Sequence, residues 1–537
     1  MPTARHRHLV PLMLIAALAT ACGSTVQGTS TVSGGAPGSA PGGGDGLGGP
    51  GQVGASAGPG SGVVGSAGST GGSFTAGSTG GGTSGGSTGF SGSGSGTTGG
   101  STGSFGTSTG GASSTPGVTA KEVYVGLVYD DNAGAVNQAA GVGSITTGDS
   151  KANARAIIAD INKHGGVGGR KLVPVFARFD STSSQTIDQQ YSAICQQFTQ
   201  DNPRVFVVND DADLSDSYRA CLAKAGVGTL STSLPLDGAA ILSRYPGLIQ
   251  QGYPNVDRLA AYEVTPLVDQ KYFTPWDTLT GQPAATGKVK VGILTYNDAV
   301  FAPAVDHILV PALKKLGYDP EVEKVAQINT AADYSAQGSA VKAAQLRFAA
   351  NGVTHIIPFE ANGGLSTLFL PTARSQNYYP RYGISSSSAF EALLETGIVD
   401  KKQMTGAVGF GWLPSVDLPS RYNPQNSPFS NANRRYCLNV LKASGITFDS
   451  GNAETVALNS CSDLYLLKAA LDKTAAQISL RNLIGTIESL GTSYQRAGGL
   501  GQTFRPGRHD PTDKAYHWRY FADCNCFHYE GALQTVP

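Results

Sequence analysis

Charged side chains are scarce in this sequence, and the two signs are present in equal numbers. Lys, Arg, Asp and Glu make up 14% of the 537 residues, with 38 basic residues against 38 acidic ones. No long run of either sign occurs. A nucleic-acid-binding surface normally carries a basic patch, and a polybasic membrane contact needs clustered Lys and Arg. The composition therefore argues against nucleic acid as a partner and against a polybasic membrane contact.

The sequence also lacks the short motifs of common enzyme active sites. After residue 118 it contains no Gly-x-Ser-x-Gly, no His-Glu-x-x-His and no Gly-x-x-x-x-Gly-Lys-Ser/Thr. The chain has eight His, which leaves few general bases. A hydrolase that uses Ser231 with His355 or His509 is supported by residue type alone. We therefore predict that the chain is not an enzyme and uses no cofactor.

The first 22 residues are typical of a bacterial export signal. Arg5 and Arg7 precede an apolar stretch, Leu9–Leu18, that is too short to span a bilayer. The letters LATAC at 18–22 follow, and they resemble the lipobox of bacterial lipoproteins, in which the Cys is lipidated after cleavage. The alternative is a plain secretory signal with an incidental Cys. We predict that Cys22 is lipidated and that the exported protein is held at the outer face of the cell membrane through this anchor alone.

Residues 23–118 have the composition of a disordered stalk. The stretch from 21 to 120 holds 37 of the 73 Gly and one charged side chain, Asp45. Such a segment cannot bury enough apolar area to offset the entropy lost on ordering. A flexible chain of this length spans on the order of 50–60 Å. We predict a tether that carries a folded domain away from the membrane; the alternative is a spacer with no further role.

Six Cys remain beside Cys22, an even number that suggests disulfides in an exported chain. Six Cys permit fifteen pairings. Closeness along the chain favours Cys195–Cys221, Cys437–Cys461 and Cys524–Cys526. The alternative for the last pair is a metal site with His528, His517 and His509 nearby, although Cys-x-Cys-x-His is not a standard zinc spacing. We predict three disulfides and no metal.

From residue 121 the chain alternates between short β-rich runs and helical stretches. Apolar residues at helical spacing predict a helix over Lys151–His164, and the Gly-rich turn at 165–169 ends it. The other elements predicted in this part are strands at Lys121–Tyr129, Lys171–Phe179, Val205–Val208 and Gly228–Ser231, and helices at Ser184–Thr199 and Ser215–Ala225. This alternation predicts right-handed crossovers and a parallel sheet.

The alternation returns after a connection at Leu248–Gly287. Strands are predicted at Lys288–Thr295, Val322–Ile328, Thr354–Pro358 and Tyr382–Ser385, and helices at Ala302–Leu316, Ser339–Asn351 and Leu365–Gln376. Further helices at Asn431–Ala443, Cys461–Ala475 and Ile478–Leu490 precede an aromatic, strand-like stretch, Thr503–Glu530. Two similar lobes suggest a cleft between them, because ligands of open α/β sheets bind outside the carboxyl ends of the strands.

One segment carries a family resemblance. Thr147–Asp180 reads TGDSKANARAIIADINKHGGVGGRKLVPVFARFD, with Gly-Asp before a helix rich in Ala and Ile, then Ile-Asn, Gly-Gly-Val, Gly-Arg-Lys and a closing Asp. It resembles the start of type I periplasmic binding proteins, the Leu/Ile/Val-binding family that serves ABC importers. The helices of Cys195 and Cys221 are similar to those of actinobacterial-type lipoprotein members. Gly-Arg-His-Asp at 507–510 is similar to the family's C-terminal piece, so the resemblance covers roughly residues 120–530.

The resemblance implies an α/β, two-lobed type I periplasmic-binding fold. Each lobe would be a parallel sheet flanked by helices, with the ligand cleft between the lobes. Residues 119–537 would form the domain: lobe one from about 119–250 plus part of 452–537, and lobe two from about 256–451. The chain would leave lobe one near Leu248–Val256 and return near Asn452–Cys461. Proteins of this fold bind a ligand when the two lobes close about a hinge, and this requires no chemical reaction.

Residues at the strand ends are the candidate ligand contacts. They are Tyr129, Asp130, Asn209, Asp210, Ser231, Thr232 and Ser233 in lobe one, and Tyr296, Asp298, Phe359, Glu360 and Ser386 in lobe two, with Trp412 as a side wall. Some have a second interpretation: Asp210 and Asp298 as helix caps or first-turn stabilisers, and Trp412 as a core anchor.

The resemblance also bears on ligand chemistry. In amino-acid-binding relatives, hydroxyl groups hold the α-carboxylate and an acidic residue of lobe two holds the ammonium. Ser231, Thr232 and Ser233 would supply the hydroxyls here. Asp210 and Asp211 would repel a carboxylate, and 385–388 has no acidic residue, although Glu360 is a substitute. These departures favour a neutral amide, polyol or cationic ligand over a branched-chain amino acid.

We therefore predict a lipid-anchored extracellular solute-binding protein. It would capture a small polar solute by closure of the lobes and deliver it to an ABC permease complex. The alternative is a surface sensor or adhesion protein that reuses the fold without a transporter, which the length of the stalk favours.

Overall fold

The first strands of the described chain form a five-stranded sheet in which every neighbouring pair is parallel. The computed structural model describes residues 115–139, 141–209, 215–232, 237–328, 330–419 and 429–537. The order of the strands across the sheet is β2-β1-β3-β4-β5. They are β1 (Glu122–Asp130), β2 (Lys171–Phe179), β3 (Val207–Asn209), β4 (Gly228–Ser231) and β5 (Leu248–Gln250). The parallel sheet predicted from the alternating pattern is confirmed.

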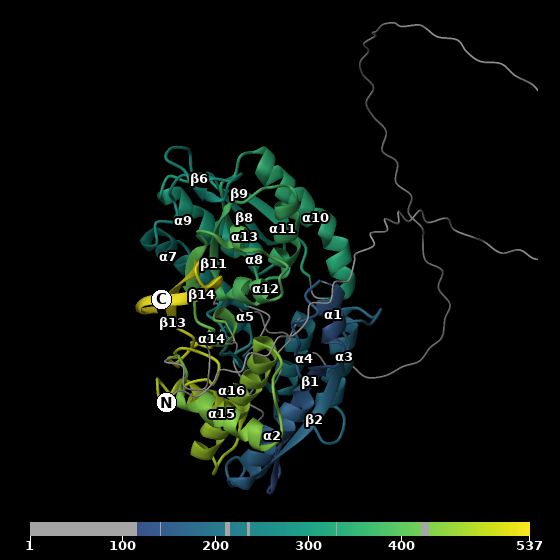
Figure 1. The fold of residues 1–537 in the computed structure, drawn as a ribbon. Coiled ribbons are helices and arrows are strands. Elements are labelled where there is room, and N and C mark those ends of the chain that lie inside the picture. Colours follow the sequence, from purple (N-terminus) through teal and green to yellow (C-terminus); the bar gives the residue numbers. More distant parts are fainter. Residues whose placement is uncertain (1–114, 140, 210–214, 233–236, 329, 420–428) are drawn as a thin grey trace, which may run out of the picture. The chain divides into compact units, whose positions relative to one another are not determined.

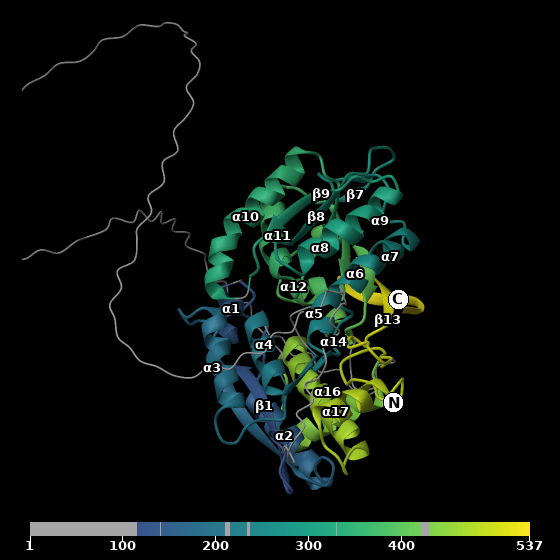
Figure 2. The same cartoon turned by 180° about the vertical axis from the view of Figure 1, so that it is seen from behind.

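Helices cover both faces of this sheet (Figures 1 and 2). One apolar cluster joins β1, β2 and the other strands to α2, α15, α16 and α17. A second cluster joins the opposite face to α3 and α4. The helices of this lobe are α1 (Ala133–Ala139), α2 (Ser150–Lys163), α3 (Ile187–Thr199), α4 (Asp216–Ala225), α5 (Ala239–Arg244), α15 (Ala432–Ala443), α16 (Gly451–Lys473) and α17 (Leu480–Glu488).

Local sequence explains the start and end of α2. The side chain of Asp149 accepts a hydrogen bond from the backbone N–H of Ala152, which caps the helix start. After the helix, Gly166 has φ +72° and lies so close to the next strand that a Cβ there would sit 1.9 Å from the carbonyl oxygen of Arg170. Only Gly fits both conditions, so this residue makes the tight return from α2 to β2.

The second lobe is built on a seven-stranded sheet of order β14-β13-β12-β11-β10-β8-β9. Its strands are β8 (Val291–Tyr296), β9 (Glu321–Val325), β10 (His355–Phe359), β11 (Arg381–Ser385), β12 (Val408–Gly411), β13 (Lys514–Phe521) and β14 (Cys526–Thr535). From β9 to β12 neighbours are parallel, and the hairpin β13–β14 adds an antiparallel edge. The aromatic C-terminal stretch thus belongs to the sheet of lobe two. A small separate hairpin pairs β6 (Trp276–Asp277) with β7 (Gln282–Pro283).

The helices of the second lobe pack on this sheet in one large apolar cluster. In both views α10 and α11 lie on one side of β8 and β9, and α7 and α9 lie on the other (Figures 1 and 2). The elements are α6 (Val256–Tyr262), α7 (Val264–Asp269), α8 (Phe301–Ala304), the π-helix η1 (Val305–Leu309), α9 (Val310–Lys315), α10 (Ala331–Ala350), α11 (Gly364–Ser375), the 3-10 helix η2 (Ser386–Ser388), α12 (Phe390–Glu395), α13 (Lys401–Met404) and α14 (Pro414–Asp417).

Hydrogen bonds tie the first connection between the lobes to the last one. The first runs from the end of β5 to α6, and the last precedes β13. Gln502 Nε2 and Thr512 Oγ1 both donate to the carbonyl oxygen of Gln251, over 2.6 and 2.7 Å. The backbone N–H of Asn255 donates to Asp510 Oδ2 over 2.8 Å. These crossing segments therefore form one hydrogen-bonded unit.

The chain returns from lobe two to lobe one earlier in the sequence than expected. The family resemblance predicts the return to lobe one near Asn452–Cys461, but Cys437, Leu438 and Leu441 of α15 are already part of the apolar cluster of lobe one. The apolar side of α15 packs against α2. The two helices are far apart in the sequence, so the sequence pattern does not reveal this contact.

Within the described residues, no helix combines the length and apolar character that crossing a membrane requires.

Candidate functional site

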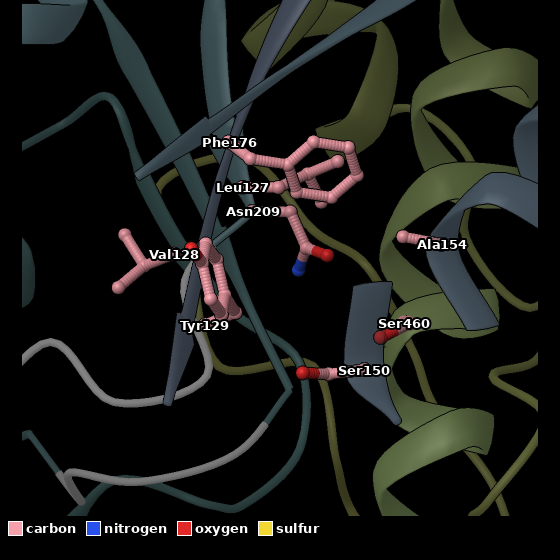
Figure 3. A pocket seen from close by; sticks show the side chains of 8 residues that line it. All are labelled: Leu127, Val128, Tyr129, Ser150, Ala154, Phe176, Asn209 and Ser460. Carbon is pink, nitrogen blue, oxygen red and sulfur yellow. The ribbon is translucent and has the colours of Figure 1, made fainter. Parts of the chain in front are cut away.

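The carboxyl ends of β1 and β3 form the candidate ligand-binding edge of lobe one. A small cavity of about 20 Å³ lies here, room for roughly one water molecule. In Figure 3 the polar ends of Asn209, Ser150 and Ser460 face the same space, whereas the side chain of Val128 points away. The structure thus brings the predicted contacts Tyr129 and Asn209 together. The full lining is Leu127, Val128, Tyr129, Ser150, Ala154, Phe176, Asn209 and Ser460.

Two cations of α2 flank the aromatic side chains of this edge. Lys151 Nζ lies 4.0 Å from the centroid of the Tyr129 ring. The guanidinium carbon of Arg155 lies 5.0 Å from the centroid of the Phe176 ring. Each contact places positive charge over an aromatic face, an attractive arrangement. The rim beside Tyr129 is therefore not purely acidic.

A buried carboxylate, Asp463 of α16, holds the strand ends of lobe one together. Asn209 Nδ2 donates to its Oδ2 over 2.6 Å, and Thr232 Oγ1 donates to its Oδ1 over 2.6 Å. Gln251 Nε2 also donates to Oδ1, over 2.5 Å. These donors follow or end β3, β4 and β5. Burial raises the pKa of Asp463 to about 7, while the hydrogen bonds of Thr232 and Gln251 oppose the shift.

Sequence reasoning missed Asp463. The available signal was an acidic residue on the apolar stretch of a predicted helix, because Leu458, Cys461, Leu464 and Leu467 around it are all buried. A buried acid among apolar positions requires polar partners from elsewhere in the fold. Asn209 and Thr232 were predicted as ligand contacts, and the structure shows that their side chains are also bound to Asp463.

The acidic residues after β1 have partners within lobe one. Asp130 Oδ1 accepts the backbone N–H of Asn132 over 2.8 Å, and burial raises its pKa. Asp131 forms an ion pair with Arg178, with Nε and Oδ1 2.8 Å apart. Ser231, the last residue of β4, is buried.

Two acidic candidates of lobe two accept backbone N–H groups of the helices that follow them. Asp298 Oδ1 accepts from Val300 and Phe301, each over 2.7 Å, and its Oδ2 accepts from a Gln side chain. Glu360 accepts the N–H of Leu365 over 2.6 Å and that of Ser366 at the start of α11. Burial raises the pKa of Glu360 to about 8, against the effect of these hydrogen bonds. Both residues therefore stabilise helix starts.

The aromatic candidates Tyr296 and Phe359 are buried on either side of Phe301. Their ring centroids lie 5.3 and 5.9 Å from that of Phe301, both in edge-to-face geometry. The Tyr296 hydroxyl reaches the carbonyl oxygen of Ala361 over 3.5 Å. These rings form part of the packing beneath the strand ends of lobe two.

Ser386 and Trp412 are joined through a second buried carboxylate, Asp417. Ser386 Oγ donates to Asp417 Oδ2 and accepts the backbone N–H of Trp412, each over 2.7 Å. Tyr529 donates to the same Oδ2 over 2.5 Å. Burial raises the pKa of Asp417 to about 7. Trp412 is fully buried and packs edge-on against Tyr253, with centroids 5.8 Å apart, as the core-anchor interpretation expects.

The remaining candidates, Asp210 and Ser233, lie outside the described residues, as do Cys22 and the stalk up to residue 114.

The three favoured disulfides, Cys195–Cys221, Cys437–Cys461 and Cys524–Cys526, are formed in the structure. Among the described residues, one group of side chains is close enough to hold a metal ion: Cys524, Cys526 and His528, whose ligand atoms lie within 4.8 Å of one another. Because both sulfur atoms are bonded to each other, neither is a thiolate that a metal would need.

Several solved structures similar to this chain are substrate-binding proteins of ABC transporters. One from Aeropyrum pernix has a TM-score of 0.53 at 13% identity, and the match covers 78% of this chain and 97% of that one. One from Desulfitobacterium hafniense in complex with Leu has a TM-score of 0.50 at 15% identity, covering 76% and 100%. A fatty acid ABC transporter substrate-binding protein from Thermomonospora curvata has a TM-score of 0.50 at 19% identity, covering 78% and 92%.

These likenesses define the fold: the chain has the two-lobed fold of type I periplasmic binding proteins. The resemblance seen in Thr147–Asp180 is thereby confirmed at the level of the fold. The three structures named above are substrate-binding proteins. No protein-family model and no curated protein matches the sequence.

Proposed function

We propose that the chain is a lipid-anchored, extracellular solute-binding protein that captures a small organic solute between its lobes and delivers it to an ABC importer. The observation that carries the proposal is the arrangement of two α/β lobes, tied by hydrogen-bonded crossing segments, with polar side chains at the strand ends. Such an arrangement can bind a ligand by closure about a hinge, which needs no chemical step. The ABC-transporter titles of similar structures support the importer as partner.

The ligand edge of lobe one supports a solute with hydrogen-bonding groups. Asn209, Ser150 and Ser460 present amide and hydroxyl groups, and Tyr129 and Phe176 present aromatic surface. Such a mixture of apolar surface with a few placed polar groups is typical of small-molecule sites. The similar structures named for Leu and for a fatty acid support a small organic molecule of this kind.

The acidic residues of the rim that the structure describes have partners. Asp298 and Glu360 are engaged by backbone N–H groups, and Asp131 by Arg178. The expected repulsion of a carboxylate rests on Asp210 and Asp211, which lie outside the described residues, and we keep carboxylate-bearing solutes among the candidates.

Uptake in the organism that encodes the protein tests the proposal. A strain lacking the gene should lose uptake of a solute that the purified chain binds, and the wild-type gene should restore it. A Cys22→Ala gene should restore less, because the protein would no longer be held beside the permease. Unchanged uptake in the deletion strain, with binding intact in the purified protein, would instead favour the sensor or adhesion function.

A further inference from the structure

Arg496 is a buried cation whose backbone is held in place from several sides. Its residue is 1% exposed. The backbone N–H donates to Gln502 Oε1 over 3.1 Å, and the carbonyl oxygen accepts from Asn431 Nδ2 over 2.8 Å. The next residue is anchored as well, since the N–H of Ala497 donates to Ser462 Oγ over 3.0 Å. The segment that carries Arg496 is thus fixed to α15, α16 and the last crossing.

The guanidinium group itself has no acceptor in the part of the chain that the structure describes. Its Nε, Nη1 and Nη2 atoms are all buried, and no described residue accepts a hydrogen bond from any of them. It lies against Gly499, where a Cβ would come within 2.2 Å of Nε. Burial lowers the pKa of Arg496 to about 10, so the group stays charged at neutral pH. A buried charge without a partner is costly, and Arg cannot relieve that cost by losing its proton.

The two carboxylates that act electrostatically on Arg496 are engaged elsewhere. Both oxygens of Asp463 accept hydrogen bonds in lobe one, from Asn209, Thr232 and Gln251. Oδ2 of Asp417 accepts hydrogen bonds in lobe two, and its Oδ1 is buried with no partner among the described residues. Gln502, which accepts the backbone N–H of Arg496, also donates to Gln251 of the first crossing, so Arg496 lies beside the crossing segments.

Aromatic groups accompany the cation. Tyr253 and Tyr529 lie near enough to Arg496 to influence its pKa. Tyr253 packs edge-on against Trp412, whose indole Nε1 is a further buried donor that finds no acceptor on any described residue. Unpartnered donors beside aromatic surface match a molecule with an anionic head and an apolar body.

We propose that Arg496 anchors the carboxylate of the bound solute, and that the solute is an aliphatic or aromatic carboxylate. The inference rests on the proposed solute-binding function and specifies its ligand. The planar guanidinium fork matches a carboxylate with two parallel N–H···O bonds. Movement of the lobes about the crossings admits the solute to this buried group. Burial holds the pKa values of Asp417 and Asp463 near 7, which reduces their repulsion of an incoming anion.

Paired probes that differ only at the carboxylate test the inference. We would titrate the full exported chain by calorimetry with octanoate and octanamide, benzoate and benzamide, and L-leucine and L-leucinamide. In the wild type, the carboxylate of at least one pair should bind at least 30-fold more tightly than its amide. In Arg496→Gln that ratio should fall below threefold, with affinity for the amide changed less than threefold. Arg496→Lys should keep part of the preference, because the charge remains.

Arg505→Gln is the matched control, since this Arg lies in the same crossing with an exposed side chain and should leave the ratio unchanged. If Arg496→Gln does not fold, Gly499→Ala moves the guanidinium without removing it and should lower the ratio at least fivefold.

Several outcomes would overturn the inference. Tight binding of amides or cations with no carboxylate preference would overturn it while leaving the solute-binding function intact. A preference that persists in Arg496→Gln would place the anchor elsewhere. If Asp417→Asn and Arg496→Gln lower the free energy of unfolding by the same amount and neither changes the ratio of carboxylate to amide affinity, Arg496 instead forms an ion pair within the protein. Failure of every probe, charged or neutral, would count against both proposals.

Discussion

Removing the carboxylate of Asp463 should destabilise lobe one strongly. Asp463→Ala leaves three buried donors, on Asn209, Thr232 and Gln251, without their acceptor. Each unsatisfied donor costs about 1–3 kcal/mol. Part of this cost is offset because the carboxylate no longer has to be desolvated. We expect a loss of about 3–5 kcal/mol in the free energy of unfolding, which is a large share of a typical domain's stability.

Equilibrium urea unfolding at pH 7, followed by circular dichroism, measures this loss. Asp463→Asn keeps one acceptor oxygen and the shape of the side chain, so it should lose only about 1–2 kcal/mol. Asp319→Ala is the control, because its side chain is 84% exposed and its ion pair with Lys314 should contribute less than about 1 kcal/mol. The reasoning would be refuted if Asp463→Ala lay within 1 kcal/mol of the wild type, or if the Asn and Ala variants were equally unstable.

Three further predictions concern the disulfides, pH and the membrane anchor. Replacing Cys437 and Cys461 together by Ala opens a loop with a sequence separation of 24 and should lower the free energy of unfolding by about 3 kcal/mol. Urea unfolding measures this loss, and an unchanged midpoint would contradict it. Burial raises the pKa values of Glu263 and Glu360 to about 8, so the folded state holds protons that the unfolded state releases above about pH 4.5. The free energy of unfolding should therefore fall by roughly 2–3 kcal/mol for each group from pH 5 to pH 7. Glu263→Gln should remove the share of this fall that Glu263 contributes. A free energy of unfolding that rises with pH, or a pH dependence that the variant leaves unchanged, would argue against this. Mass spectrometry of the exported protein should find diacylglycerol on Cys22, and an unmodified N-terminal Cys would exclude the anchor.

The regular part of the fold was predictable because apolar spacing and turn residues are local signals. Lys171–Phe179 and Gly228–Ser231 match β2 and β4 residue for residue. Errors arose where a helix start lacks an apolar stripe. The helix α10 begins at Ala331, where Thr330 and Asp333 form a capping box, and not at Ser339. The capping box could have been recognised in the sequence. The strand Val408–Gly411 could not, because it is short and half of its residues are Gly.

The site was predictable only in part because its chemistry depends on distant segments. Two candidates from the strand-end rule, Tyr129 and Asn209, line one small cavity. The rule has no means of finding Asp463 or Arg496, which come from a helix and a crossing segment far along the chain. As ligand contacts, the strand-end residues stay predictions until a bound solute is identified.

The most direct test of solute binding is thermal unfolding of the exported chain in the presence of candidate solutes. The panel would contain amino acids, amides, polyamines, sugars, and aromatic and fatty acids. We predict that one chemically coherent group of solutes raises the unfolding temperature, with a gain of about 2.7 kcal/mol at a hundredfold excess over the Kd. An unfolding temperature that no solute of the panel raises would contradict the account of this chain as a solute-binding protein.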